Sequence, residues 1–299
     1  MAADRAANGA EPSYEAGSWE SADGLTLRYR DYPARPDAPA GRPPILCLPA
    51  LTRNARDFEP VADSFAGEWR VICPDLRGRG ASDYAKDPAT YAPLQYVEDI
   101  LLLLDQLGLT RVVAMGTSLG GIVTMLLAVQ RPGLLAGAML NDIGPVIEEA
   151  GLDRVRDYVG HGGSYPTWMH AARALAEQSG DVHPDFAISD WLRHAKRLMC
   201  LGQSGRIVLD YDMKIAEPFD EQGNQAALNL WPALEALAGC PTLTLRGELS
   251  DILSAETLAE MGRRLPDMEL VTVPRVGHIP TLEEPPVQEA MARLLARVQ

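Results

Sequence analysis

Short apolar runs alternate with longer amphipathic runs along most of the chain. The short runs are rich in β-branched residues and end at turn-forming residues, which is the pattern of buried strands. They read TLRYRDY, PPILCLPA, RVICPDL, RVVAMG, LLAGAMLND, PTLTLRGE and MELVTVPR. Between them, the segment 94–109 has apolar residues every three or four positions and ends near Gly108, which predicts an amphipathic helix. This alternation predicts an α/β fold with a mostly parallel sheet and helices on both faces.

The alternation stops in the segment 145–225. That segment contains three helix-like pieces with no strand signal between them: DRVRDYVG, PTWMHAARALAEQS and DFAISDWLRHAKRL. We predict that it forms a helical cap inserted between the two parts of the core, residues 18–144 and 226–299. Residues 1–17 are polar and small, and we predict that they are a disordered N-terminal segment.

The sequence GTSLGG lies between a strand-like run and a helix-like run, so it must form an abrupt turn. In such a G-x-S-x-G turn the central residue, here Ser118, adopts a strained backbone that lifts its hydroxyl above the sheet. Gly116 and Gly120 leave room because they have no Cβ. The helix that begins near Leu119 points its free N–H groups at the same place, where they would stabilise a negatively charged oxygen. An isolated motif of this kind is also found in ordinary turns, so a nucleophilic Ser118 requires a base and an acid elsewhere in the chain.

His278 is the candidate base, because it follows the last strand-like run. Loops at the carboxyl ends of parallel strands are where such sheets gather their chemistry. For the acid that orients His278 we predict Asp251, which follows PTLTLRGE. Asp142 follows the preceding strand-like run and is the alternative; it could instead bond local backbone N–H groups. The remaining histidines lie in the predicted cap, where surface positions are expected: His161, His170, His183 and His194.

Charge and cysteine content limit the possible partners. Against 27 Lys and Arg, the 299-residue chain has 41 Asp and Glu, a formal net charge of −14, which disfavours binding to nucleic acid or to anionic membranes. No signal-peptide pattern and no apolar run of bilayer length is present, so we expect a cytoplasmic protein. The four cysteines lack metal-ligand spacing, and we expect no metal and no other cofactor.

Three segments together resemble the α/β-hydrolase superfamily. Besides GTSLGG, the segment DLRGRGAS (75–82) resembles the D-x-R-G-x-G-x-S loop of that superfamily, and GHIPTLEEP resembles its catalytic-histidine segment. The resemblance extends from about Ser18 to the end of the chain. It implies a sheet of about eight strands, with the nucleophile after the fifth strand, the cap after the sixth, the acid after the seventh and the histidine after the eighth.

The resemblance implies a triad of Ser118, Asp251 and His278, with the backbone N–H groups of Leu51 and Leu119 as the oxyanion hole. Where the superfamily often has His-Gly before the first of these donors, the chain has Pro49-Ala50, which makes the geometry of that loop an open question. The next residues, Thr52, Arg53 and Asn54, are polar and would lie near the mouth of the site.

The predicted substrate is a small-molecule carboxylic ester of small to medium apolar character, with lactones as a near variant. Relatives that cleave carbon–halogen bonds or epoxides use an aspartate nucleophile, so a serine at position 118 disfavours those reactions. Two alternatives stay open: a carbon–carbon bond hydrolase of ring-cleavage dienoates, which uses the same triad, and a non-catalytic ligand receptor on the same fold.

Overall fold

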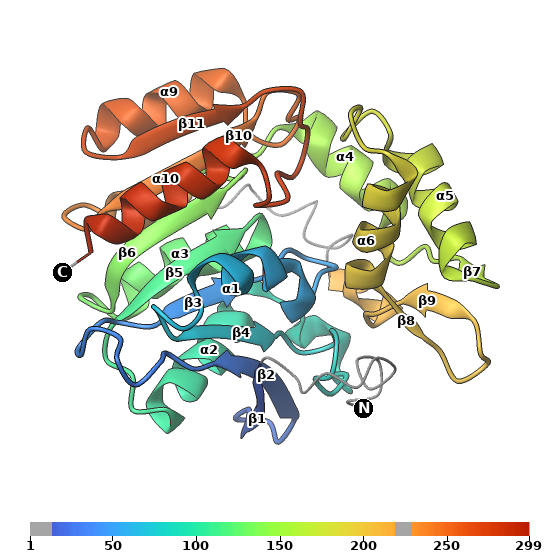
Figure 1. Ribbon diagram of the computed structural model, residues 1–299, viewed down its shortest axis with the longest axis horizontal. Helices are drawn as coiled ribbons and strands as arrows, with labels where there is room; N and C mark the ends of the chain where they lie inside the picture. Colours follow the sequence, from blue (N-terminus) through green and yellow to red (C-terminus); the bar gives the residue numbers. More distant parts are fainter. Residues whose placement is uncertain (1–13, 219–228, 299) are drawn as a thin grey trace.

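A central eight-stranded sheet organises the chain (Figure 1). The computed structural model describes residues 14–218 and 229–298. The strand order is β1-β2-β4-β3-β5-β6-β10-β11. All neighbouring strands from β4 to β11 are parallel, whereas β1 pairs antiparallel with β2, and β2 pairs antiparallel with β4. The strands are β1 (Glu15–Glu20), β2 (Thr26–Tyr32), β3 (Ile45–Leu48), β4 (Val71–Asp75), β5 (Val112–Thr117), β6 (Leu135–Asn141), β10 (Thr242–Gly247) and β11 (Glu269–Val273). The predicted mostly parallel sheet is confirmed.

Helices cover both faces of this sheet because the inner strands are apolar on both sides. In β3, Leu46 and Leu48 join the core on one face, while Ile45 and Cys47 point into the core on the other. The first face packs against α2 (Pro93–Gln106), α3 (Leu119–Gln130), α8 (Trp231–Glu235) and α9 (Ala255–Arg264). The second packs against α1 (Glu59–Phe65) and α10 (Pro285–Ala296). Within the described residues, no helix is both long and apolar enough to cross a bilayer.

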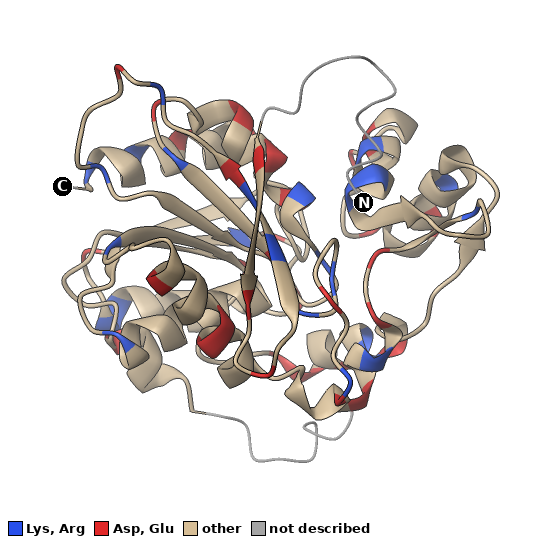
Figure 2. Cartoon of the chain, turned by 90° about the horizontal axis from the view of Figure 1, so that it is seen from below, with Lys and Arg blue, Asp and Glu red and all other residues tan. Residues whose placement is uncertain are grey.

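A smaller layer, which we call the cap (residues 149–209), follows β6. It contains α4 (Glu149–Tyr158), α5 (Trp168–Ser179), α6 (Ile188–Leu198) and a small sheet of β7 (Ser164–Tyr165), β9 (Ile207–Leu209) and β8 (Met199–Leu201). Figure 1 shows these elements grouped at one side of the main sheet, and in Figure 2 both acidic and basic residues lie on that side of the molecule. The three small strands were not expected, because two or three residues are too few to give a strand pattern. The predicted end of the insertion at residue 225 lies outside the described residues.

The N-terminal prediction is wrong for residues 15–17. They belong to β1 and pair with residues 29–31 of β2, so the pairing orders a segment whose own composition is weakly apolar. Residues 1–13 lie outside the described part of the chain.

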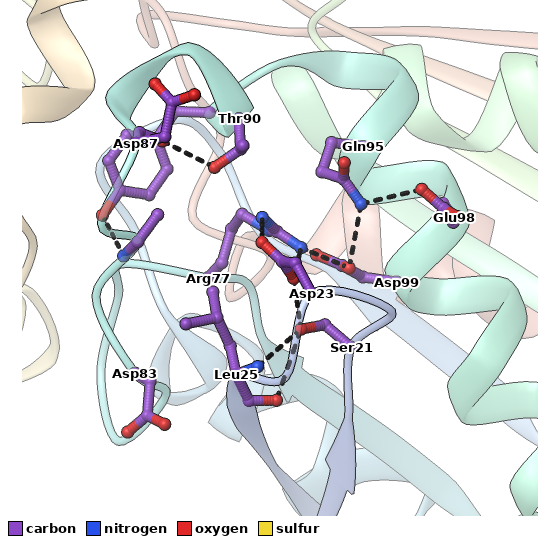
Figure 3. A network of polar contacts seen from close by, with 12 residues as sticks. Ser21, Asp23, Leu25, Arg77, Asp83, Asp87, Thr90, Gln95, Glu98 and Asp99 are labelled. Carbon is purple, nitrogen blue, oxygen red and sulfur yellow. Dashed lines mark hydrogen bonds and ion pairs between the residues drawn. The ribbon is translucent and has the colours of Figure 1, made fainter.

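A buried arginine braces the loop after β4. Arg77 is fully buried, and its guanidinium bonds Asp99 on α2 at 2.7 Å and Asp23 in the β1–β2 turn at 2.9 Å (Figure 3). Asp75 accepts a hydrogen bond from Ala55 N at 2.7 Å. The Arg77 bonds thus tie the loop after β4 to α2 and to the β1–β2 turn, and the Asp75 bond ties the end of β4 to the segment after β3.

Candidate active site

Ser118 occupies the sharp turn between β5 and α3. Its backbone has φ 51° and ψ −114°, a conformation that L-residues rarely adopt. A Cβ added at Gly116 would overlap the carbonyl of Gly120, and one added at Gly120 would overlap the carbonyl of Leu48. The two glycines therefore permit the close strand–helix approach that the turn requires.

The structure brings His278 to Ser118. His278 lies in the loop after β11, and its Nε2 is 3.0 Å from Ser118 Oγ. Its Nδ1 is 2.7 Å from Oδ2 of Asp142. The His278 side chain is only 7% exposed and the Asp142 side chain is fully buried, so water competes little with either hydrogen bond.

The prediction that Asp251 orients His278 is wrong in this structure; the carboxylate bonded to the ring is that of Asp142. Asp142 directly follows β6, and its two oxygens also accept hydrogen bonds from Gly247 N at 2.8 Å and Ser250 Oγ at 2.6 Å. Asp251 is instead held by Arg154 of α4, through Nε at 2.5 Å and Nη2 at 2.7 Å. Burial, the largest single effect, raises the pKa of Asp251, but the hydrogen bonds and the positive charge of Arg154, with smaller contributions from a backbone hydrogen bond and His278, together lower it below its usual value.

The backbone N–H groups of Leu119 and Leu51 are the two predicted oxyanion donors. Leu119 is the first residue of α3, so its N–H has no acceptor within the helix. The peptide that carries Leu51 N–H is fixed, because the carbonyl of Ala50 accepts a hydrogen bond from Arg53 N at 3.1 Å. Ala50 is not among the residues with positive φ, so the loop does not need a glycine there.

The peptide that follows Leu51 is held through the Leu51 carbonyl by Arg79. Residue 79 is one of the variable positions of the DLRGRGAS motif. Arg79 Nε donates to the Leu51 carbonyl at 2.8 Å and Nη1 donates to the Arg77 carbonyl at 2.6 Å. The guanidinium is fully buried and lies 4.8 Å from the ring centre of Tyr96. Its Nη2 has no hydrogen-bond partner among the described residues, and no carboxylate there forms an ion pair with it. Sequence patterns did not single out Arg79, because its partner lies 28 residues away.

On the cap side of the site, Arg53 contacts His194, one member of a cluster of aromatic rings. Arg53 Nε is 2.5 Å from Oδ2 of Asp57, and its Nη1 is 3.3 Å from Nε2 of His194. His183 stacks on Phe186 with ring centres 4.3 Å apart. The expectation of surface positions is wrong for both histidines, which are at least nine-tenths buried. Within residues 14–218 and 229–298, no group of three or more His, Cys, Asp and Glu is placed to bind a metal ion.

Burial of the two rings predicts a loss of stability in mild acid. Burial, and secondarily Arg53, lower the pKa of His183 from 6.5 to about 4, and burial lowers the pKa of His194 well below its usual value. In the unfolded chain both imidazoles bind protons below about pH 6.5, whereas the buried rings stay neutral. The contribution of the neutral rings to the free energy of unfolding is therefore fully present above that pH and is lost as the pH falls towards 4. For His183 alone we expect a loss of about 2 kcal/mol between pH 7 and pH 4.5. Urea unfolding at both pH values should show a smaller loss for His183→Gln, and an equal loss would contradict this origin.

Comparisons with known proteins agree with the fold and with the presence of a hydrolase site. The model of the alpha/beta hydrolase family matches residues 45–291. The 3-hydroxybutyrate-oligomer hydrolase of Cupriavidus necator is 34% identical over 257 residues, 83% of this chain and 86% of that protein. The mouse sn-1-specific diacylglycerol lipase ABHD11 is 30% identical over 258 residues, 81% of this chain and 77% of that protein. A crystal structure of an alpha/beta hydrolase from Novosphingobium aromaticivorans has 57% identity and a TM-score of 0.92, covering 97% of this chain and all of the other.

Proposed function

Because the chain belongs to the α/β-hydrolase family, we propose that it is a serine hydrolase of carboxylic esters with a Ser118–His278–Asp142 triad. One observation carries the proposal: a continuous relay of hydrogen bonds from Asp142 to His278 at 2.7 Å and from His278 to Ser118 at 3.0 Å. A serine hydroxyl is a weak nucleophile unless a neighbouring base accepts its proton, and this relay supplies the base and fixes its orientation.

The geometry supports acyl transfer in two steps. Asp142 accepts a hydrogen bond from the Nδ1–H of His278, so Nε2 carries no proton and can take the proton of Ser118 as Oγ attacks the ester carbonyl. The tetrahedral oxyanion would face the N–H groups of Leu51 and Leu119. His278 then gives its proton to the leaving alcohol, and water releases the acyl group from Ser118 by the same route.

Two relatives support an ester as the substrate. Oligomers of a hydroxy acid are joined by ester bonds, and a lipase cleaves ester bonds of glycerides, which is the chemistry that the names of the Cupriavidus necator and mouse proteins describe. The activity would then be of carboxylesterase type, with lactones accepted as cyclic esters. No contact in the described site favours a carbon–carbon bond hydrolase or a receptor over this assignment.

A substrate panel combined with active-site labelling tests the proposal. The panel contains p-nitrophenyl esters of increasing chain length, several lactones and a ring-cleavage dienoate. We expect many turnovers per molecule on esters and one fluorophosphonate adduct, which peptide mapping places on Ser118. Turnover of the dienoate alone would indicate a carbon–carbon bond hydrolase. Labelling without turnover on any substrate would indicate a receptor.

A further inference from the structure

A small cavity adjoins the reacting groups on the cap side. Its volume is about 10 Å³, and it is lined by Arg53, Asp57, Thr117, His194, Arg197 and Ile279 among others. Thr117 directly precedes Ser118, and Ile279 directly follows His278. The cavity holds roughly one water-sized group, so it can take a single oxygen atom of a ligand whose reacting bond lies at Ser118.

Arg53 presents hydrogen-bond donors to this cavity in a fixed orientation. Its side chain is only 15% exposed, and Asp57 and His194 fix Nε and Nη1. Its third nitrogen, Nη2, forms no hydrogen bond with another residue of the described chain. It is also not fully buried, so it is accessible from outside the protein. Because Nη2 is accessible, the planar guanidinium can donate a hydrogen bond to a ligand carboxylate while its bond to Asp57 stays in place.

The other cationic group of the cavity, Arg197, is also paired with a carboxylate. Arg197 binds Glu283 at 2.5 Å and lies 4.0 Å from Glu59. Arg53 keeps one nitrogen, Nη2, without a partner in the described chain, and its pairing with Asp57 limits how strongly it attracts a further anion.

Two buried histidines extend the polar wall beside Arg53. His194 lies against its Nη1, and the His183 ring centre is 5.8 Å from that of His194. His183 Nδ1 is buried and has no hydrogen-bond partner among the described residues, which is a costly arrangement. The residue before His183, Val182, accepts a hydrogen bond from Gly277 N at 2.7 Å, next to His278. The two histidines thus connect the segment of Arg53 to the His278 loop, and His194 is the one of the two that lines the cavity.

We propose that Arg53, supported by His194, binds a carboxylate of the substrate close to the ester bond, a proposal that rests on the ester hydrolase function above. Arg53 is two residues beyond the oxyanion donor Leu51, so the two backbone positions are at most about 7 Å apart. The preferred substrates are therefore short esters that carry a free acid group a few bonds from the scissile carbonyl. The acid group lies on either the alcohol side or the acyl side of the ester.

Matched pairs of substrates test this preference. On the alcohol side we compare 3-acetoxypropanoate with its methyl ester, and on the acyl side monomethyl succinate with dimethyl succinate. For one of the pairs, we expect kcat/KM of the wild type to be about 10- to 100-fold higher for the acid, the gain expected from charge-assisted hydrogen bonds. In Arg53→Gln that ratio should fall to near one. The ratio is the readout because a general loss of activity affects both members of a pair equally.

Arg56→Gln is the matched control. Arg56 lies in the same loop, but its guanidinium bonds the carbonyls of Arg197 and Met199 and the carboxylate of Asp210, and it does not line the cavity. This variant should keep the wild-type ratio. An equal rate for acid and neutral ester in the wild type, or an unchanged ratio in Arg53→Gln, would overturn the proposal.

A binding measurement separates this proposal from the proposed function. Ser118→Ala should bind monomethyl succinate or 3-acetoxypropanoate in a calorimetric titration, and the double variant with Arg53→Gln should bind it at least 10-fold more weakly. If the wild type hydrolyses no ester yet this difference is found, the ester function fails and the carboxylate site stands. If neutral esters are hydrolysed but neither carboxylate binds through Arg53, the ester function stands and the carboxylate site fails.

Discussion

Ser118→Ala is expected to abolish ester hydrolysis, with a loss in kcat on the order of 10⁶, the size found when a serine protease loses its nucleophile. The variant retains Gly116, Gly120 and the backbone of the turn, so only the attacking oxygen is removed. Stability should stay within about 1 kcal/mol of the wild type or rise, because active sites often trade stability for activity. Turnover of p-nitrophenyl butyrate and urea unfolding of the same preparations measure both quantities.

Ser254→Ala provides the control for this experiment. Ser254 caps α9 through a hydrogen bond to Thr257 N at 3.2 Å, far along the chain from the nucleophile. Its loss should cost about 1 kcal/mol of stability and leave turnover intact. Turnover by pure Ser118→Ala protein at a tenth of the wild-type rate would remove Ser118 from the mechanism.

Asp142→Asn should lower kcat by about 10⁴, because an amide donor facing His278 Nδ1 favours the tautomer that cannot accept the serine proton. Asp251→Asn should change kcat less than 10-fold, since Asp251 contacts Arg154 and not the ring. Steady-state kinetics on one ester, with circular dichroism to verify folding, distinguish the two variants.

The stability of these variants should follow a different order from their activity. The ion pair of Asp251 with Arg154 is about one-third exposed on each side, so its loss should cost 1 kcal/mol or less. Asp142 is fully buried and accepts three hydrogen bonds, so Asp142→Asn should cost more. A greater loss of turnover in Asp251→Asn than in Asp142→Asn would return the acid to position 251.

The sequence predicted the sheet and the main helices because their signals are local and repeated. Buried strands such as β3 and β5 are short apolar runs, and α2 has a regular apolar stripe. The positions of Ser118 and His278 followed from glycine spacing and from the place of each residue after a strand. Each of these inferences needs only residues close together in the chain.

The acid could not be chosen in this way, because Asp142 and Asp251 follow neighbouring strands of the same sheet. Sequence position places both carboxylates at one edge, and only the directions of the side chains decide which one reaches the ring. The loop after β10 contributes Gly247 N and Ser250 Oγ, which hold Asp142 in place, while its own carboxylate turns to Arg154. The backbone of Asp142 is left-handed, with φ 56°, a conformation that aspartate tolerates better than most residues.

The fully buried guanidinium of Arg79 has a consequence for the engineering of heat-tolerant variants. Burying a charge without a carboxylate partner is costly, so a methionine of similar volume at position 79 would favour the folded state. The same change would leave the carbonyl of Leu51 without its donor and loosen the loop that carries the proposed oxyanion donor Leu51 N–H. Selection for survival at high temperature and selection for turnover would therefore favour different residues at this one position.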